Sequence, residues 1–258
     1  MTKFFSKEEV YDNIIPNKLM GVYYFICPEG KILYIGKSKN IRLRISQHLK
    51  NGRKRLLIQF TRIKIKILST EIEALLFESQ EIKKHLPIFN RRLRKIKNTV
   101  SIFEEMNSQG YKFFQIKKTD NNSIIEFNSK KIAQKFIMNL SQEFVLCDKI
   151  NELDKSTKSC FKYHLKSCRG ACINNESPQT YNQRYDKALS KIYRFPINCK
   201  LHFKEEQYST YVNIKNNRVT EFGITNKSKY KIDYPSLDEM KIVISYRKKT
   251  MPKILLNK

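Results

Sequence analysis

A strand–turn–strand pattern close to the N-terminus limits the possible folds of this chain more than any other feature. Two short tripeptides, Gly21-Val22-Tyr23 and Tyr34-Ile35-Gly36, lie ten residues apart at its two ends. The residues after the first tripeptide are mostly aromatic or β-branched, Pro28-Glu29-Gly30 supplies turn residues, and an apolar run follows. The pattern therefore predicts two strands joined by a turn, with one tripeptide on each strand.

A helix is predicted directly after the second strand, with Asn40 as its N-cap. Its core-facing positions recur at every fourth residue: Ile41, Ile45 and Leu49. Arg44 and His48 are also four residues apart, so we expect them to share one face of this helix. Lys37 stands just before the helix and one residue after Gly36, where we expect a tight turn.

A second helix is predicted from the capping-box pattern Thr70-Glu71-Ile72-Glu73. Its apolar stripe is Ile72, Leu75, Ser79, Ile82 and Leu86. At about 100° per residue, Glu78 lies roughly 60° from Leu75 and therefore flanks this stripe. A carboxylate in such a place has to be paired, hydrogen-bonded or bound to a metal, because burying it alone is costly. Pro87 ends the helix, and Asn90 follows one turn later.

These elements resemble the GIY-YIG nuclease family. Seven positions carry the resemblance at the family's spacing: Tyr23, Tyr34, Lys37, Arg44, His48, Glu78 and Asn90. The resemblance implies a small α/β domain with a short mixed sheet and flanking helices, in which both tyrosines line one active site. It also implies that Arg44 stabilises charge on the phosphate, that Glu78 holds a single divalent metal (Mg²⁺ or Mn²⁺), and that Asn90 completes the site. Lys37 and His48 stand where relatives carry a lysine and a tyrosine or histidine.

These residue types suit phosphodiester hydrolysis. Negative charge develops on the non-bridging and leaving oxygens, so the site needs a cation and fixed donors. A metal on Glu78 can polarise the phosphate, and Arg44 offers a planar fork of donors. A tyrosine, with a reference pKa of about 10, is a poor base near neutral pH unless nearby cations lower that pKa. Whether Tyr23 or Tyr34 takes the proton of the attacking water stays open.

Four cysteines form a second group with the spacing C-x12-C-x7-C-x3-C: Cys147, Cys160, Cys168 and Cys172. We see no signal peptide and no apolar stretch long enough to span a membrane, so we expect a cytoplasmic protein. Clustered cysteines in that compartment bind metal or work in redox chemistry more often than they form structural disulfides. Four thiolates suit either tetrahedral zinc or an iron–sulfur cluster, and the spacing alone does not choose between them.

The cysteine-rich segment resembles the corresponding region of the UvrC/Cho excinuclease family, and of its shorter members most. Leu146-Cys147, the run over 160–172 and Asn-Glu-Ser at 175–177 carry this resemblance, which covers about 15–195. It implies an iron–sulfur cluster, with zinc as the alternative. It further implies a single-strand incision of damaged double-stranded DNA, 3′ of the lesion, in nucleotide excision repair. The implied partner is a UvrA/UvrB-type damage-recognition complex, and the protein is expected to be monomeric and associated with a bacterial nucleoid.

The charge of the chain fits a nucleic-acid partner. It carries 51 Lys and Arg against 24 Asp and Glu, for a formal net charge of +27. Twelve basic residues and no acidic one lie between Lys31 and Lys66, beside the predicted helix with Arg44. Such a field attracts the phosphate backbone and makes binding salt-dependent, but it reads no sequence. No amphipathic anchor or lipidation motif favours a membrane partner.

The predicted fold class is α/β (α+β), organised as three domains. We expect a nuclease domain over 1–97, a helical cysteine-rich region over 98–199 and a small β-rich region over 200–258. The last region leaves no room for the second nuclease domain of full-length excinucleases, so one incision is expected instead of two. Two alternatives stay open: a DNA-binding scaffold with a degenerate nuclease site and a redox-sensing cluster, and a structure-specific flap or branch nuclease outside repair.

Overall fold

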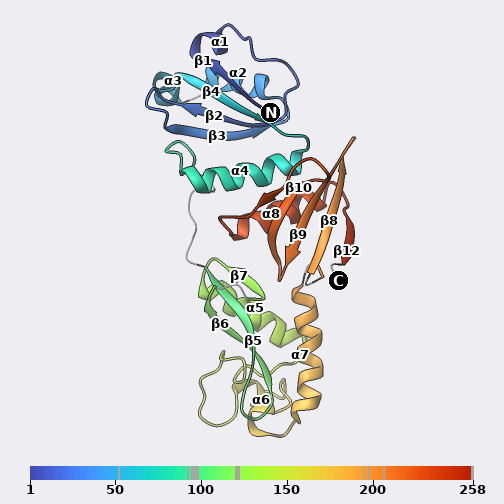
Figure 1. Ribbon diagram of the computed structural model, residues 1–258. Coiled ribbons are helices and arrows are strands. Elements are labelled where there is room, and N and C mark those ends of the chain that lie inside the picture. Colours follow the sequence, from blue (N-terminus) through green and yellow to red (C-terminus); the bar gives the residue numbers. More distant parts are fainter. Residues whose placement is uncertain are drawn as a thin grey trace. The chain divides into compact units, whose positions relative to one another are not determined.

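The chain forms two compact units in the computed structural model (Figure 1). The described residues are 1–51, 53–91, 93, 99–119, 123–193, 195–196, 198–205 and 207–256. One unit joins Met1–Ile96 to Asn198–Lys258, and the other is Lys97–Ile197. Helices and sheets occur in both units, which confirms the predicted mixed α/β class. The division into three domains stays a prediction, although the nuclease part and the C-terminal β region belong to one compact unit.

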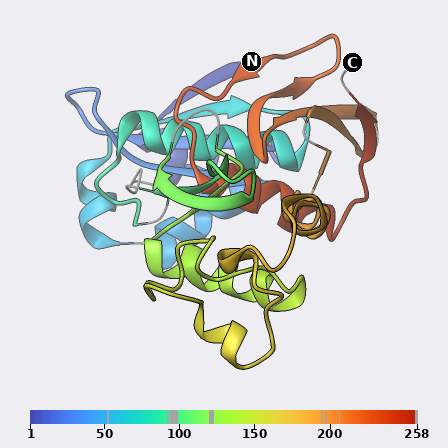
Figure 2. The ribbon, with the colours of Figure 1, turned by 90° about the horizontal axis from the view of Figure 1, so that it is seen from below.

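The unit Lys97–Ile197 is a three-stranded antiparallel sheet, in the order β6-β5-β7, with helices packed against it (Figure 2). Its elements are β5 (Val100–Met106), β6 (Lys112–Lys118), β7 (Ile125–Phe127), α5 (Lys130–Glu143), α6 (Phe161–His164), the 3₁₀ helix η1 (Ala171–Ile173) and α7 (Pro178–Ile192). Tyr181 and Tyr185 of α7 are completely buried in its core. Their rings contact those of Tyr111, just before β6, and of Phe114 within β6.

The N-terminal part of the other unit is a four-stranded sheet in the order β1-β4-β2-β3. Its elements are β1 (Thr2–Ser6), α1 (Lys7–Tyr11), β2 (Gly21–Ile26), β3 (Ile32–Ser38), α2 (Ile41–Asn51), α3 (Lys54–Gln59), β4 (Arg62–Ile67) and α4 (Glu71–His85). All pairings among its described strands are antiparallel, so the expectation of a mixed sheet was wrong in this detail. The reason is topological: β4 runs in the same direction as β3 but pairs on the opposite side of β2, so no two parallel strands become neighbours.

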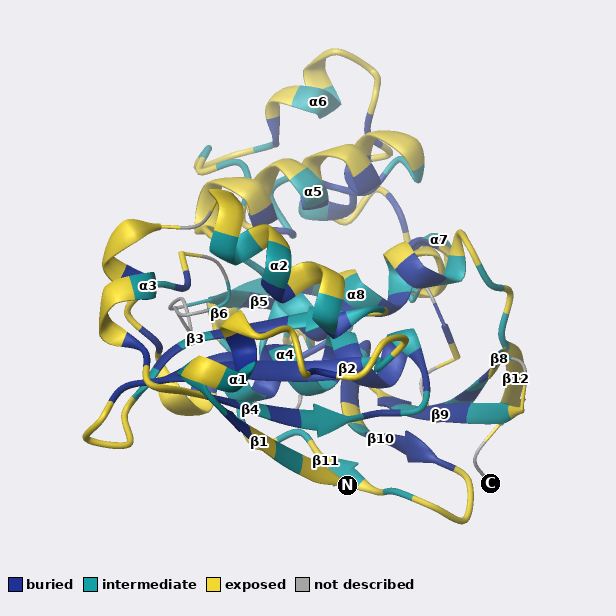
Figure 3. Ribbon diagram, turned by 90° about the horizontal axis from the view of Figure 1, so that it is seen from above, coloured by how far each residue is buried: buried dark blue, intermediate teal, exposed yellow. Residues whose placement is uncertain are grey.

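Strand β2 is buried along its whole length because helices cover both faces of the sheet (Figure 3). Tyr23 and Phe25 lie in one core with residues of α1 to α3. Val22 and Tyr24 lie in a second core, with residues of α4. The alternation of the strand therefore sends Tyr23 toward α2 and Tyr24 toward α4.

The helix starts follow their sequence signals in part. The side-chain oxygen of Asn40 accepts the backbone N–H three residues ahead at 3.2 Å, as expected of an N-cap. Thr70 caps α4 in the same way, accepting the backbone N–H of Glu73 at 3.3 Å. The reciprocal half of the predicted capping box was wrong, since the Glu73 carboxylate accepts the Ser69 backbone N–H at 2.9 Å instead. Its other oxygen accepts the Ser228 hydroxyl at 2.6 Å, so Glu73 binds the C-terminal region.

The C-terminal part of this unit is a five-stranded antiparallel sheet in the order β11-β10-β9-β8-β12. Its elements are β8 (Asn198–Glu205), β9 (Tyr208–Lys215), β10 (Arg218–Ile224), β11 (Tyr230–Lys231), α8 (Leu237–Arg247) and β12 (Lys253–Leu256). Asn216 and Asn217 both have positive φ and close the β9–β10 hairpin. Helix α4 contacts the N-terminal sheet as well as α8 and β10 (Figure 1). None of the helices that the structure describes combines the length and the apolar character needed to cross a bilayer.

Candidate active site

Strands β2 and β3 bring the two tripeptides side by side. Tyr23 pairs in register with Gly36, and the ring centroids of Tyr23 and Tyr34 lie 6.1 Å apart. Gly36 lies inside β3, so the tight turn expected at this position was wrong. A Cβ atom at Gly36 would lie only 2.4 Å from the Tyr23 hydroxyl oxygen. The glycine therefore leaves the space that the Tyr23 phenol occupies.

The buried Tyr23 hydroxyl forms a hydrogen bond with Nε2 of His48, at 2.9 Å. Burial, together with the positive charges of Arg44 and Arg53, lowers the pKa of His48 to about 4. Burial and the neighbouring Tyr34 raise the pKa of Tyr23 well above its usual value, against the opposing effect of Arg44. Tyr23 thus keeps its proton and His48 stays neutral at pH 7, so the pair is an uncharged hydrogen-bonded unit.

The low pKa of His48 predicts how stability responds to acid. Its pKa is lower in the folded state than the unfolded reference of 6.5, so the unfolded chain binds more protons between about pH 6.5 and 4. Stability is therefore lost as the pH falls through that range. We expect His48→Gln, which keeps a hydrogen-bonding group, to remove this loss. Thermal unfolding of the wild type and of His48→Gln from pH 7 to 4 would measure how the stability of each depends on pH. Parallel curves of stability against pH would contradict the prediction.

Arg44 and His48 of α2 line one cavity of about 530 Å³ together with Tyr34. The Arg44 side chain is exposed, and its Nη1 donates a hydrogen bond to Oε1 of Gln47 at 3.0 Å. The expected shared face of Arg44 and His48 is thus present, and it turns toward Tyr34. A planar guanidinium at an open cavity can donate to an incoming phosphate with little reorganisation.

Glu78 of α4 reaches the edge of β3. Its Oε1 accepts the backbone N–H of Lys37 at 2.9 Å. The Lys37 ammonium instead pairs with Glu71 at 2.6 Å, and Lys39 pairs with the other oxygen of Glu71 at 2.9 Å. Among the described residues Glu78 has no ion-pair partner. Burial raises its pKa to about 7, although the Lys37 N–H opposes this shift.

The environment of Glu78 fits a bound cation. A half-buried carboxylate with a raised pKa and no cationic partner is stabilised in its charged form when a metal ion neutralises it. Hard divalent cations prefer carboxylate oxygens as ligands. The second carboxylate nearby, Glu71, is already held by two lysines. Glu78 is therefore the acidic side chain of this site that is suited to hold Mg²⁺ or Mn²⁺.

Asn90 is buried, and β3 occupies both polar groups of its side chain. Its Nδ2 donates to the backbone oxygen of Ile35 at 2.8 Å, and its Oδ1 accepts the backbone N–H of the same residue at 2.9 Å. These two bonds fix the segment after α4 to the strand that carries Tyr34. In this arrangement Asn90 acts on the site by holding β3 in place.

A second cavity, of about 710 Å³, joins the predicted residues of different elements. Tyr34, Lys37, Glu78 and Asn90 line it, and Tyr34 also borders the cavity with Arg44 and His48. Tyr23 lines neither cavity because it lies buried behind Tyr34 and beside His48. Sequence reasoning missed several residues of the larger cavity: Arg53, Glu71, Lys241, Ser245 and Lys249. The sequence pattern marks Glu71 only as part of a helix cap.

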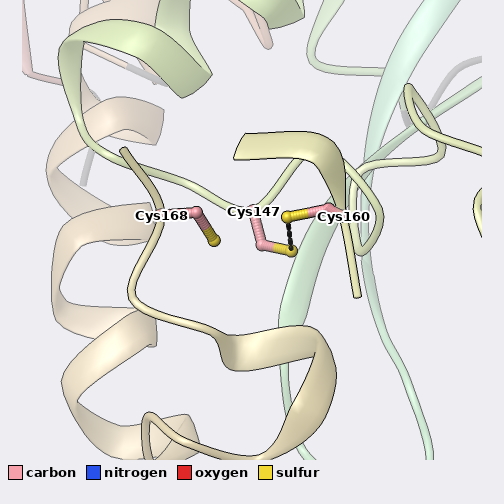
Figure 4. A group of neighbouring side chains, drawn as sticks. All are labelled: Cys147, Cys160 and Cys168. Carbon is pink, nitrogen blue, oxygen red and sulfur yellow. Dashed lines mark hydrogen bonds between the residues drawn. The ribbon is translucent and has the colours of Figure 1, made fainter. Parts of the chain in front are cut away.

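Three of the four predicted cysteines gather in the unit Lys97–Ile197 (Figure 4). The Sγ atoms of Cys147, Cys160 and Cys168 all lie within 4.8 Å of one another, and all three residues are buried. Cys172 stands outside this group but adjoins it, since its Sγ accepts the backbone N–H of Cys160 at 3.4 Å. The hydrogen bond from Cys147 lowers the pKa of Cys168, which favours a thiolate. This donor set fits a thiolate-bound metal or cluster, with Cys172 as the nearest fourth thiol.

An ion pair of α7 supports the segment that carries the first cysteine. Nε and Nη2 of Arg184 each donate at 3.0 Å to a backbone oxygen, that of Phe144 and that of Val145. Nη2 also donates to the Glu176 carboxylate at 2.8 Å. Arg184 thereby ties α7 to the turn that leads into Cys147.

Comparison with known proteins agrees with this site. A family model described as the UvrC-like GIY-YIG domain matches residues 19–91, and a model of the UvrC/Cho excinuclease middle domain matches 98–191. The N-terminal part is therefore the catalytic domain of a GIY-YIG endonuclease. The chain is 31% identical over 231 residues to excinuclease Cho of Salmonella typhi, covering 86% of this chain and 75% of that protein. The chain thus belongs to the UvrC/Cho excinuclease family and is an endodeoxyribonuclease.

Further relatives include longer proteins and a solved domain. UvrABC system protein C of Wolbachia pipientis wMel is 32% identical over 182 residues, which is 67% of this chain and 30% of that protein. The GIY-YIG N-terminal endonuclease domain of UvrC from Thermotoga maritima, solved with its catalytic divalent cation magnesium, is 26% identical. The matched region is 32% of this chain and 97% of that domain, and the TM-score is 0.30.

Proposed function

We propose that this enzyme makes a single-strand incision in damaged double-stranded DNA, 3′ of the lesion, in nucleotide excision repair. The observation that carries the proposal is the meeting of Tyr34, Lys37 and Glu78 in one cavity, with Arg44 beside Tyr34. Similarity to an excinuclease over 86% of the chain supports the role in excision repair. A degenerate DNA-binding scaffold would lack part of this set, whereas all seven predicted residues are present.

The chemistry that we propose uses the chain's own groups around a cation on Glu78. When bound, Mg²⁺ or Mn²⁺ supplies positive charge that polarises the phosphate and stabilises the leaving oxygen. Arg44 donates hydrogen bonds to a non-bridging oxygen as its charge grows. Tyr34 is partly exposed and borders both cavities; it releases its phenol proton to solvent and then, as the phenolate, accepts the proton of the attacking water. Tyr23 is buried and bound to His48, so it positions Tyr34 and the imidazole instead.

The four cysteines are proposed to hold an iron–sulfur cluster, with zinc as the alternative. The gathering of three buried thiols with a fourth beside them supports a tetrathiolate site. We expect Cys168→Ser to lose most of the bound metal and to destabilise the unit Lys97–Ile197, because metal binding contributes to folding. Cys199→Ser is the matched control, since Cys199 is also buried but lies outside the group.

Visible absorption and metal analysis of anaerobically purified protein would measure which metal the cysteines bind and how much of it. Iron with a charge-transfer band in the wild type and in Cys199→Ser, but not in Cys168→Ser, is the expected result. Stoichiometric zinc without absorption would select the alternative. Equal metal content in both variants would contradict a site on these cysteines.

The proposed partners are damaged double-stranded DNA and a UvrA/UvrB-type damage-recognition complex, with the enzyme acting as a monomer. We place it in the bacterial cytoplasm, on the nucleoid, and propose no membrane partner. The basic run from Lys31 to Lys66 beside the cavities supports a DNA substrate, since its charge attracts phosphates.

Incision mapping on a duplex with one bulky adduct tests the repair role. The duplex is labelled at either end, and undamaged and flap duplexes serve as comparisons, each with and without the recognition complex. A discrete nick on the 3′ side of the adduct, absent from the undamaged duplex, is the expected result. Preferred cutting of the flap would favour a branch nuclease outside repair. No cut of the adduct duplex even with the complex would overturn the repair role.

A further inference from the structure

The C-terminal β region contributes one wall of the active-site cavity. Lys241, Ser245 and Lys249 follow one another at four-residue intervals, so they lie on one face of α8 and the turn after it. All three line the cavity that also holds Tyr34 and Glu78. The sequence around the GIY-YIG tripeptides does not predict this wall, because its residues lie more than 150 positions further along the chain.

The wall is positively charged and available to a ligand. Lys241 and Lys249 are exposed. Neither ammonium group has an ion-pair or hydrogen-bond partner within the part of the chain that the structure describes. The acidic residue on this edge of α8, Asp238, is directed to Lys83, at 3.8 Å between Oδ2 and Nζ. Lys37, on the opposite wall, is by contrast held by Glu71. Lys241 of α8 and Lys249 of the turn after it therefore offer charge that no described residue neutralises.

A buried polar network fixes this wall to the helix that carries Glu78. Glu239 of α8 is only 1% exposed, and its Oε1 accepts hydrogen bonds from Ser79 Oγ at 2.7 Å and Gln80 Nε2 at 2.9 Å. Lys83 of α4 donates to the same oxygen and completes a buried ion pair. The other oxygen, Oε2, accepts the backbone N–H of Ser236 at 3.0 Å and caps α8. Removing a partner from such a pair is strongly destabilising, so α8 holds one place relative to Glu78.

We propose that α8 and the turn after it form a second DNA-binding wall. Lys241 and Lys249 there bind backbone phosphates that neighbour the scissile phosphate. The inference rests on the proposed function of the cavity. Positive side chains in a groove recognise the repeating negative charge of a nucleic-acid backbone and position it without reading its bases. The C-terminal region then acts as a substrate-positioning part of the nuclease.

Equilibrium binding in EDTA tests the wall without requiring cleavage. The variant is Lys241→Ala/Lys249→Ala. The control is Lys215→Ala/Lys231→Ala, which removes two exposed lysines of the same β region from outside the cavity. Binding of a short labelled duplex is measured at several salt concentrations. Because each phosphate contact contributes about 0.9 to the slope of log affinity against log salt, we expect the first variant to flatten this slope by about 1.8. The control slope should stay near that of the wild type.

Equal slopes for the two variants would overturn the proposal that α8 binds DNA. The two lost charges would then act only through the overall electrostatic field of the protein. The same experiment tests whether this face binds a protein instead of DNA. A flattened slope with the duplex alone excludes a protein partner, and unchanged DNA binding by Lys241→Ala/Lys249→Ala favours one. Nicking by the wild type is measured separately with Mg²⁺. A flattened slope without wild-type nicking would contradict the proposed function alone, and normal nicking with equal slopes would contradict the wall alone.

Discussion

Replacing Glu78 with glutamine is expected to slow DNA nicking at least about 1000-fold. Glutamine keeps an oxygen that can accept the Lys37 backbone N–H, so the local fold should persist. It removes the charge that holds the cation, and a metal ion at a phosphate supplies several kcal/mol of transition-state stabilisation. A loss of about 4 kcal/mol corresponds to three orders of magnitude in rate. Single-turnover nicking of a labelled duplex measures it.

Glu71→Gln is the matched control for Glu78→Gln. It changes the other glutamate of α4 that lines the cavity, which forms ion pairs with Lys37 and Lys39, whereas Glu78 has no ion-pair partner among the described residues. We expect the control to lose much less activity, and both variants to bind DNA in EDTA about as tightly as the wild type. Equal losses in the two variants would show that the cation is not held by Glu78 in the way proposed here.

Tyr34→Phe is expected to lower the nicking rate by about 100-fold to 10,000-fold, the usual contribution of a positioned general base. Tyr23→Phe should act differently, because the Tyr23 hydroxyl is buried and bonded to His48. Losing that bond is expected to cost stability by about 0.5 to 1.5 kcal/mol, with a smaller effect on rate. Nicking rates and thermal unfolding of both variants separate the two roles.

The opposite pattern would reassign the base. If Tyr23→Phe lost the larger share of the rate while keeping its stability, the proton would go to Tyr23. The rings of Tyr23 and Tyr34 lie only 6.1 Å apart. If both variants lost nicking rate to the same extent and neither lost stability, Tyr34 would not be the general base on its own.

The local elements of the nuclease part were predictable because their signals lie close together in the sequence. Asn40 caps α2 and Thr70 caps α4, as side chains at those positions do in many proteins. The placement of one tripeptide on each of two neighbouring strands followed from a short hairpin, and the structure adds the register in which Tyr23 pairs with Gly36. What Gly36 does could not be predicted, because the atom it leaves room for belongs to the neighbouring strand.

Long-range contacts were beyond the sequence patterns. Asn90 was expected to complete the site, and only the structure shows both of its polar groups bonded to Ile35. Glu73 looked like half of a capping box, but a serine about 150 residues later takes one of its oxygens. The α8 wall is of the same kind, since no local pattern connects Lys241 to Glu78. The cysteine spacing did predict a group, and Cys172 is the member whose place it could not set.

We infer that this chain cuts one strand of DNA with a divalent metal. The most direct test is a time course of wild-type protein on an end-labelled duplex that carries a bubble, with Mg²⁺ in one series and EDTA in the other. We predict a single discrete nick with Mg²⁺ and an intact duplex in EDTA. Cutting in EDTA at the same rate, or an intact duplex in both series even with the recognition complex present, would contradict it.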